Sequence, residues 1–213
     1  MIRETPTPYD ARMQRLADTL FWTFASLWLA AALAGGIAAA AIFPAALELP
    51  LSLTGYEAFI AADPEHGRQL VAGHLVEQVF ALTGGMRSVL APLTALALLA
   101  QLALAPRAAM QRTRLIAVAL AALALLAGSF WSQPRFAEEV SVYRAAARTG
   151  SIEEAAAMKP ALDAAHVRAT RVASTEVVAL LGLILVSAWT AGRSGAGGSA
   201  SFRASSSRTT RRG

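Results

Sequence analysis

Residues 20–47 form an unbroken run without a charged side chain. About 20 apolar residues are enough for a helix to cross the hydrocarbon core of a bilayer. The apolar region of a cleaved signal peptide is shorter, at roughly 7 to 15 residues. We therefore interpret this run as a membrane span, and a chain that contains it as one that folds in lipid.

Three further uncharged runs follow, at residues 88–106, 115–134 and 177–192. The last is the shortest, so its span must tilt less, thin the bilayer, or take in Glu176 and the turn before it. We predict an all-α membrane protein with four transmembrane helices. The expected spans are about residues 20–44, 87–106, 114–134 and 173–192.

The composition favours a membrane protein and excludes several classes of site. Of all residues, 55% are hydrophobic and 15% are charged, against about 25% charged in an average soluble domain. Cysteine is absent, which excludes disulfides, thiolate zinc sites and cysteine nucleophiles. The sequence has no phosphate-binding glycine loop, nucleophile elbow or dinucleotide motif. We expect neither an enzyme nor a bound cofactor.

Arginines indicate the orientation of the chain. Short cytoplasmic loops of membrane proteins carry an excess of basic residues. Such residues precede the first span, crowd the loop between the second and third spans, and follow the fourth: Arg3, Arg12, Arg15, Arg107, Arg112, Arg114 and the arginines of the C-terminal tail. The loop at residues 48–67 has four acids and no lysine or arginine. We expect a bacterial cytoplasmic membrane protein with both termini in the cytoplasm.

The chain divides into three parts. Residues 1–19 are expected to be a cytoplasmic segment, and residues 20–192 a single membrane domain. Residues 193–213 contain five arginines and no acid, and are rich in serine and glycine, which predicts a disordered tail. Attraction of this tail to anionic lipid headgroups is expected, and nucleic acid is not an expected partner.

Helical signals continue beyond the spans on the external side. Asp63 followed by Pro64 predicts an N-cap, and a helix over residues 64–105 would be about 60 Å long, twice the hydrocarbon thickness. An apolar stripe also continues past residue 134 as far as Gly150. A capping-box pattern then predicts a short helix that Pro160 interrupts before the last long helix. We expect long, packed helical extensions outside the membrane.

A set of short motifs of small and aromatic residues resembles the transmembrane protein 205-like family. These motifs are Trp28 to Pro44 with Gly35, Gly36 and Phe43, followed by Ala72, Gly73 and Phe80. Members are four-span proteins, carrying a domain of unknown function in bacteria, with an acidic external loop and long outer helices. A histidine often precedes their last span, as His166 does here, although the aromatic residue that usually stands before it is missing. The resemblance covers about residues 16–192 and implies an architecture without an established reaction.

Two charged residues border the second and fourth spans at a similar depth. Counted outward from Arg107 and Arg193 at the cytoplasmic ends of these spans, Arg87 and Glu176 each lie roughly one span length away. Charges at the edge of the hydrocarbon are costly unless they are paired or hydrated. Two hypotheses follow: both side chains extend separately into the headgroup layer, or they form an Arg87–Glu176 ion pair.

The external part offers weak candidates for a metal site. His74 and Glu77 lie three residues apart on one helix face, and His166 lies on the last helix at a similar level. Histidine with carboxylate can bind a transition metal, but no histidine spacing typical of a zinc site is present. Ordinary solvated helix faces are the alternative explanation.

Small residues at four-residue intervals in the first span favour close helix packing. They form two rows, Ala31, Gly35 and Ala39, and Ala32, Gly36 and Ala40. Either the other spans or a second copy of the chain can pack there. Besides the lipid bilayer, we therefore expect a homo-oligomer or a membrane protein as partner. The leading hypothesis is a structural or accessory protein; the alternatives are a small-molecule or ion transporter or channel subunit, and a metal-binding membrane protein.

Overall fold

A computed structural model describes residues 8–50, 52–104 and 109–206. Over these residues the chain is helical, with no strand. The elements are α1 (Pro8–Glu48), α2 (Glu57–Ala62), α3 (Pro64–Leu104), α4 (Ala109–Ala127), the π-helical turn η1 (Gly128–Ser132), α5 (Gln133–Arg148) and α6 (Ile152–Ser206). The predicted all-α membrane fold is confirmed, because four helical segments are long and apolar enough to cross a bilayer.

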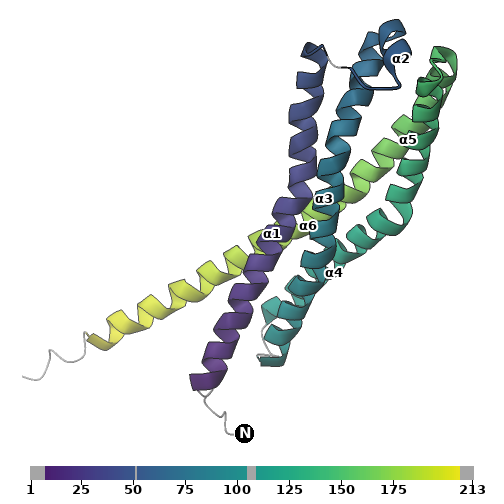
Figure 1. Cartoon of the computed structure of the whole chain (residues 1–213). Helices are drawn as coiled ribbons and strands as arrows, with labels where there is room; N and C mark the ends of the chain where they lie inside the picture. Colours follow the sequence, from purple (N-terminus) through teal and green to yellow (C-terminus); the bar gives the residue numbers. More distant parts are fainter. Residues whose placement is uncertain (1–7, 51, 105–108, 207–213) are drawn as a thin grey trace, which may run out of the picture.

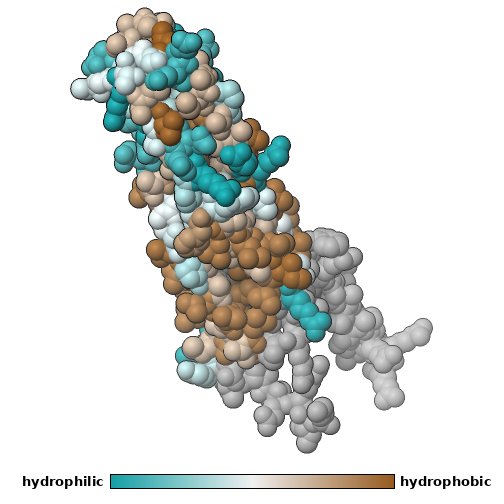
Figure 2. Space-filling model, turned by 90° about the vertical axis from the view of Figure 1, so that its right-hand side faces the viewer, coloured by the Kyte–Doolittle hydropathy of each residue, from teal (hydrophilic) through white to brown (hydrophobic). Residues whose placement is uncertain are grey.

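The four long segments run alternately in opposite directions (Figure 1). α1 packs along α3, α4 and α5 pack on α6, and α1 also crosses α6. The start of α1, the end of α3, the start of α4 and the end of α6 lie at the same end of the molecule, and α2 lies at the opposite end (Figure 1). Figure 2 shows apolar residues over the lower half of one face and polar residues gathered towards the α2 end. This is the distribution expected for a bundle with its lower part in lipid and its upper part in water.

Two separate apolar clusters hold the bundle together. The larger lies in the membrane part and includes Phe21 and Trp28 of α1, Leu98 of α3 and Leu180 of α6. The smaller lies at the α2 end and packs aromatic residues against small ones: Tyr56, Phe59, Leu70, Tyr143, Ala146, Ala147 and Ala155. The helical extensions therefore have a core of their own outside the apolar band.

The corner between α2 and α3 forms where the sequence predicts a helix start. The backbone N–H of His66 donates to Asp63 Oδ1 at 3.2 Å, as expected for an N-cap, and the His66 ring lies 2.7 Å from Asp63 Oδ2. Gly67 allows α2 to approach closely, since a β-carbon there would lie 2.8 Å from the backbone Cα of Ile60. α3 then runs unbroken through Gly84 and Gly85 to Leu104.

The small residues of α1 divide into a packed row and an open row. Ala31 and Gly35 are buried, and a β-carbon at Gly35 would lie 2.5 Å from Cε1 of Phe80 on α3. Gly36 and Ala40 are exposed, and a β-carbon at Gly36 would have no neighbour within 4 Å. The first row therefore packs within the chain.

Two sequence predictions differ from the structure in the last helix. Pro160 does not separate two helices but lies inside α6. Proline removes one helical hydrogen bond and crowds the carbonyl four residues earlier, yet Ala155 and Ala165 are buried on either side of it and keep the helix in place. The Lys159 ammonium also lies 3.3 Å from an Asp163 carboxylate oxygen across the proline.

The second difference concerns residues 193–206, for which the sequence predicts disorder. α6 continues as a helix to Ser206. Extending an existing helix fixes one residue for each new hydrogen bond, whereas starting one fixes several, so a long helix can run on into a poor helix-forming sequence. Arg3, Arg107 and residues 207–213 lie outside the described residues.

Candidate functional site

A buried polar cluster joins three helices within the bundle. Arg87 of α3 donates from Nη1 to Glu176 Oε2 of α6 at 2.9 Å, which is one of the two arrangements hypothesised from the sequence. Trp28 of α1 donates from Nε1 to the other carboxylate oxygen, Oε1, at 2.7 Å. Both oxygens of one carboxylate are therefore held by donors from two different helices.

The burial of this cluster is unequal among its members. The side chains of Glu176 and Arg87 expose 2% and 15% of their surface, and Trp28 is fully buried. The Nε of Arg87 has no hydrogen-bond partner. A buried ion pair does not guarantee stability, because desolvation offsets the attraction, but removing one partner leaves an uncompensated charge. The cluster thus makes the packing of α1, α3 and α6 depend on a single carboxylate.

A second polar cluster lies nearer the chain termini. Arg114 at the start of α4 donates to Ser187 Oγ and to Gln101 Oε1, each at 3.2 Å. Gln101 in turn donates from Nε2 to the Ala17 carbonyl of α1 at 3.4 Å. These contacts connect all four long helices at a level where Arg114 is buried.

Aromatic rings complete the surroundings of Arg114. Its guanidinium carbon lies 5.4 Å from the Phe21 ring centre and 5.3 Å from that of Trp22, both on α1. A cation over an aromatic face is attracted by the ring quadrupole. The sequence indicated Arg114 as a cytoplasmic flanking charge, whereas the structure places it inside the bundle.

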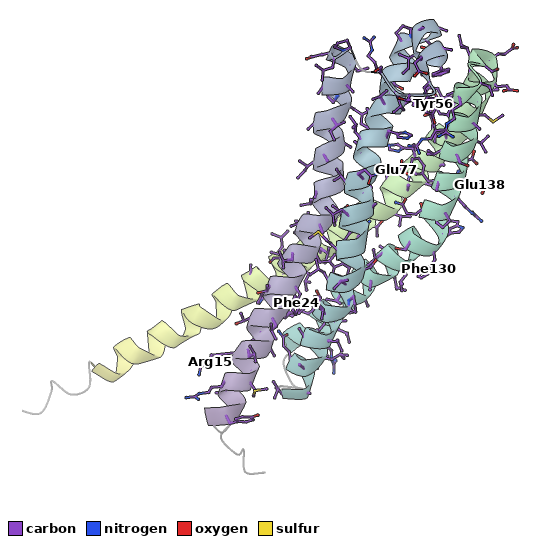
Figure 3. All side chains as sticks on the ribbon, viewed as in Figure 1. Arg15, Phe24, Tyr56, Glu77, Phe130 and Glu138 are labelled. Carbon is purple, nitrogen blue, oxygen red and sulfur yellow. The ribbon has the colours of Figure 1, made fainter. Side chains whose placement is uncertain are left out.

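The three metal candidates do not form a common ligand set. Glu77 pairs with Arg144 of α5, whose Nη2 lies 2.8 Å from Glu77 Oε2. The ring of His74 lies against Tyr56 with 6.2 Å between centres, and that of His166 lies 5.9 Å from Phe136. Among the described residues, no group of three or more histidines and acids could hold a metal ion. The extension uses these residues to join its helices (Figure 3, where Tyr56 and Glu77 are labelled).

Hollows in the bundle lie apart from both buried clusters. The larger has a volume of about 520 Å³ and opens to the outside between α1 and α3, with an apolar lining of Leu27, Ala81, Leu82, Gly85, Met86, Val89 and Leu90. Arg87, Glu176 and Arg114 do not line it. The buried polar groups therefore contact one another instead of facing this opening.

Comparison with known proteins adds no relative. No family model, curated protein or solved structure matches the chain.

The sequence did not reveal two parts of these clusters. Trp28 stands in an uncharged run, where its indole N–H gave no sign of a carboxylate partner 148 residues away in the chain. Ser187 is likewise a single polar residue within an apolar run of the sequence. Isolated polar groups in spans often form hydrogen bonds with groups on neighbouring helices, and this tendency is the signal that could have indicated these contacts.

Proposed function

We propose that this chain is a structural or accessory protein of a bacterial cytoplasmic membrane. The observation that supports this most directly is that its buried polar groups bind one another. Glu176 holds α1, α3 and α6 together, and Arg114 and Gln101 join all four long helices near the start of α4. Such an arrangement favours a fixed bundle, and the helical extension beyond the membrane then presents a surface of defined shape to a partner.

The orientation and the family are parts of the same proposal. The arginine distribution supports cytoplasmic termini, which places the α2 end outside the cytoplasm. We also propose membership of the transmembrane protein 205-like family, and the support for this is the set of short sequence motifs at Trp28 to Pro44, Ala72, Gly73 and Phe80. A homo-oligomer or another membrane protein is the partner that we propose, alongside anionic lipid at the basic C-terminal segment.

A test of the structural role measures water access to the bundle interior. Since the chain has no cysteine, single substitutions Thr94→Cys and Leu98→Cys report on buried positions of α3 without background. We expect neither to react with a water-soluble thiol reagent in proteoliposomes, and Ala61→Cys on exposed α2 to react fully. Solute or ion flux should equal that of empty liposomes.

Glu176 also supports a second candidate, a subunit of a small-molecule or ion transporter or channel. Ionisable residues within spans mark ion and proton pathways in many membrane proteins. In that case Thr94→Cys would react, and flux through proteoliposomes would depend on Glu176. Flux that Glu176→Gln abolishes would replace the structural proposal by this one.

A partner-binding role makes a separate prediction for the extension. A photo-crosslinking amino acid at Glu138, which is exposed on α5 (Figure 3), should give a discrete protein adduct in cells. The same group at Leu185, exposed on the apolar part of α6, should give lipid adducts. Absence of a protein adduct at Glu138 and at further exposed positions of α5 would argue against a partner on this face.

A further inference from the structure

The π-helical turn η1 leaves a buried hydroxyl without a hydrogen bond. Ser132 exposes 8% of its surface, and its Oγ has no partner. Other helical hydroxyls in this chain donate to the carbonyl four residues earlier, as Thr94 does to Leu90 at 2.8 Å and Ser88 to Gly84 at 3.0 Å. π-helical turns disturb this local pattern and often lie at functional sites. The Ser132 hydroxyl is therefore a buried polar group that lacks a partner among the described residues.

Ser132 lines a small hollow between two helices. The hollow has a volume of about 10 Å³ and is lined by Trp131, Ser132, Arg135, Ala165 and Arg168. A space of this size takes about one water-sized group. It can therefore seat a single oxygen atom of a larger ligand whose remaining atoms lie at the rim.

The rim carries two arginines from different helices and no acid. Arg135 of α5 and Arg168 of α6 are both exposed, and neither forms an ion pair with any described residue. The Arg135 guanidinium carbon lies 5.1 Å from the Trp131 ring centre, so the ring supports it beside the hollow. Guanidinium groups match the geometry of phosphate oxygens and bind them in pairs of hydrogen bonds.

The position along the helices also suits a phosphate. The uncharged run of the third span ends at Pro134, one residue before Arg135. Phe130 and Trp131 are exposed by 80% and 53%, and Phe130 is on the outside of the bundle in Figure 3. Tryptophan is enriched at the membrane–water boundary, which is where lipid phosphates lie.

We propose that this hollow is a binding site for a phosphate group. One phosphate oxygen accepts a hydrogen bond from Ser132, and the guanidinium groups of Arg135 and Arg168 hold the others. The phosphate can belong to the headgroup of a phospholipid or to a free anion, and the chemistry of recognition is the same. This site goes beyond the proposed structural role and does not depend on it.

The test uses the full chain purified in detergent micelles, with tryptophan emission as the readout. It is titrated in one arm with phosphatidylglycerol in mixed micelles and in the other with sodium phosphate, against sodium chloride of equal ionic strength. We expect a saturable change in emission that Trp131→Phe removes, because Trp131 lines the hollow. Saturation by the lipid alone identifies a headgroup site, and saturation by inorganic phosphate identifies a site for the free anion.

Substitutions distinguish a defined phosphate site from nonspecific attraction of anions to surface arginines. Arg135→Gln and Arg168→Gln should each weaken binding about tenfold, and Ser132→Ala about threefold or more, from the loss of hydrogen bonds to a charged group. Arg171→Gln is the matched control, since Arg171 is exposed on the same helix but does not line the hollow. Its affinity should stay within twofold. Gel filtration and helicity of each variant establish that it is folded.

Three results would overturn the proposal. The first is no saturable change with either probe, which would mean that the hollow holds water only. The second is an equal loss of affinity in the Arg168→Gln and Arg171→Gln variants. The third is unchanged binding in a folded Ser132→Ala variant, which would place the anion on the arginines but outside the hollow.

Discussion

At the residue scale, Glu176 is the side chain on which most of the membrane part depends. Its carboxylate accepts hydrogen bonds from Trp28 and Arg87, and it is almost completely buried. A charge within the apolar region is tolerated only when its partners replace the water it loses. Arg87 therefore stabilises the fold mainly by compensating the buried charge of Glu176, and the ion pair itself adds little net stability.

Arg87→Gln should lower the free energy of unfolding by about 3–5 kcal/mol, because it leaves Glu176 charged and unpaired inside the bundle. The double variant Arg87→Gln with Glu176→Gln should recover most of this loss, since both charges are then gone. The measurement is denaturant unfolding in mixed micelles for the two single variants and the double variant. Additive losses in the double variant would show that the two residues act independently.

Trp28→Phe should lower the free energy of unfolding by about 1–3 kcal/mol, since it removes the donor to a buried charged acceptor but keeps an aromatic ring. Trp22→Phe is the control, because Trp22 is only partly buried and a phenyl ring keeps an aromatic face beside the Arg114 guanidinium. Unfolding in mixed micelles measures both. Equal effects of the two substitutions would mean that ring volume, and not the hydrogen bond, matters at Trp28.

At the element scale, the absence of a side chain at Gly35 lets α1 pack closely against α3. Gly35 of α1 lies against the Phe80 ring of α3, while Gly36 faces outward. In lipid, such backbone approach and the packing it allows are major sources of attraction between helices. The two adjacent glycines of α1 therefore have different roles.

Gly35→Leu should destabilise the α1–α3 pair by about 1–3 kcal/mol because the added side chain overlaps the Phe80 ring. Gly36→Leu should change stability by no more than about 0.5 kcal/mol, as is usual for substitutions at an open surface. Unfolding in mixed micelles compares the two. A larger loss at Gly36 would instead indicate a contact of this row with a second copy, which the oligomeric mass would then report.

The start of α3 should lose stability at low pH, because its N-cap is the carboxylate of Asp63. Burial raises the pKa of the Asp63 carboxyl, but hydrogen bonds to His66 and the charge of His66 outweigh burial, so the pKa lies below the ordinary 3.8. A group with a lowered folded pKa stabilises the fold above its unfolded pKa and loses this effect as the pH falls through the folded value. Hydrogen-exchange protection factors at the start of α3, which are corrected for the intrinsic exchange rate, should therefore fall below about pH 4.

Asp63→Ala provides the comparison for this acid effect. It should remove the pH dependence and cost about 1 kcal/mol at neutral pH, the usual effect of deleting an N-cap. Ser151, which caps the start of α6 through the Glu154 N–H at 3.4 Å, is a control corner without a titrating cap. Equal acid sensitivity at both corners would assign the effect to groups other than Asp63.

The sequence predicts most of the elements but only part of the candidate site. Uncharged runs reveal the spans, and Asp63 with Pro64 marks the start of α3, because these signals are local. The Arg87–Glu176 pair was predictable from equal depth. The hydrogen bond from Trp28 to Glu176 was not predictable, because it depends on the rotation of α1 about its own axis. η1 was missed because Gly128 and Ser129 look like any small residues in a span.

At the scale of the whole molecule, the start of α1, the end of α3, the start of α4 and the end of α6 lie at one end of the bundle (Figure 1). The opposite end has a second apolar cluster of its own. The two halves of the molecule therefore differ along its long axis: one half is embedded in lipid, and the other is exposed to water. This asymmetry makes the proposed orientation directly measurable.

Gln14→Cys and Ala61→Cys place a thiol at exposed positions near the two ends. In intact cells, a membrane-impermeant maleimide should label Ala61→Cys, on the external side, and should label Gln14→Cys only after the membrane is broken. The rest of the chain contributes no thiol. The reverse pattern would place the termini outside the cytoplasm and the α2 end inside.

The π-helical turn η1 determines how far α5, in the external half, is rotated about the helix axis relative to α4, in the membrane half. An α-helix turns about 100° with each residue, and η1 inserts extra backbone where α4 leaves the apolar band and α5 begins. Deleting one residue there would restore a regular helix and turn the extension about a quarter of a revolution around the axis. Tyr143 would then leave its cluster with Phe59, although the membrane half would be unchanged. Deletion of a single residue in η1 would therefore rotate the external half of this helix relative to its membrane half.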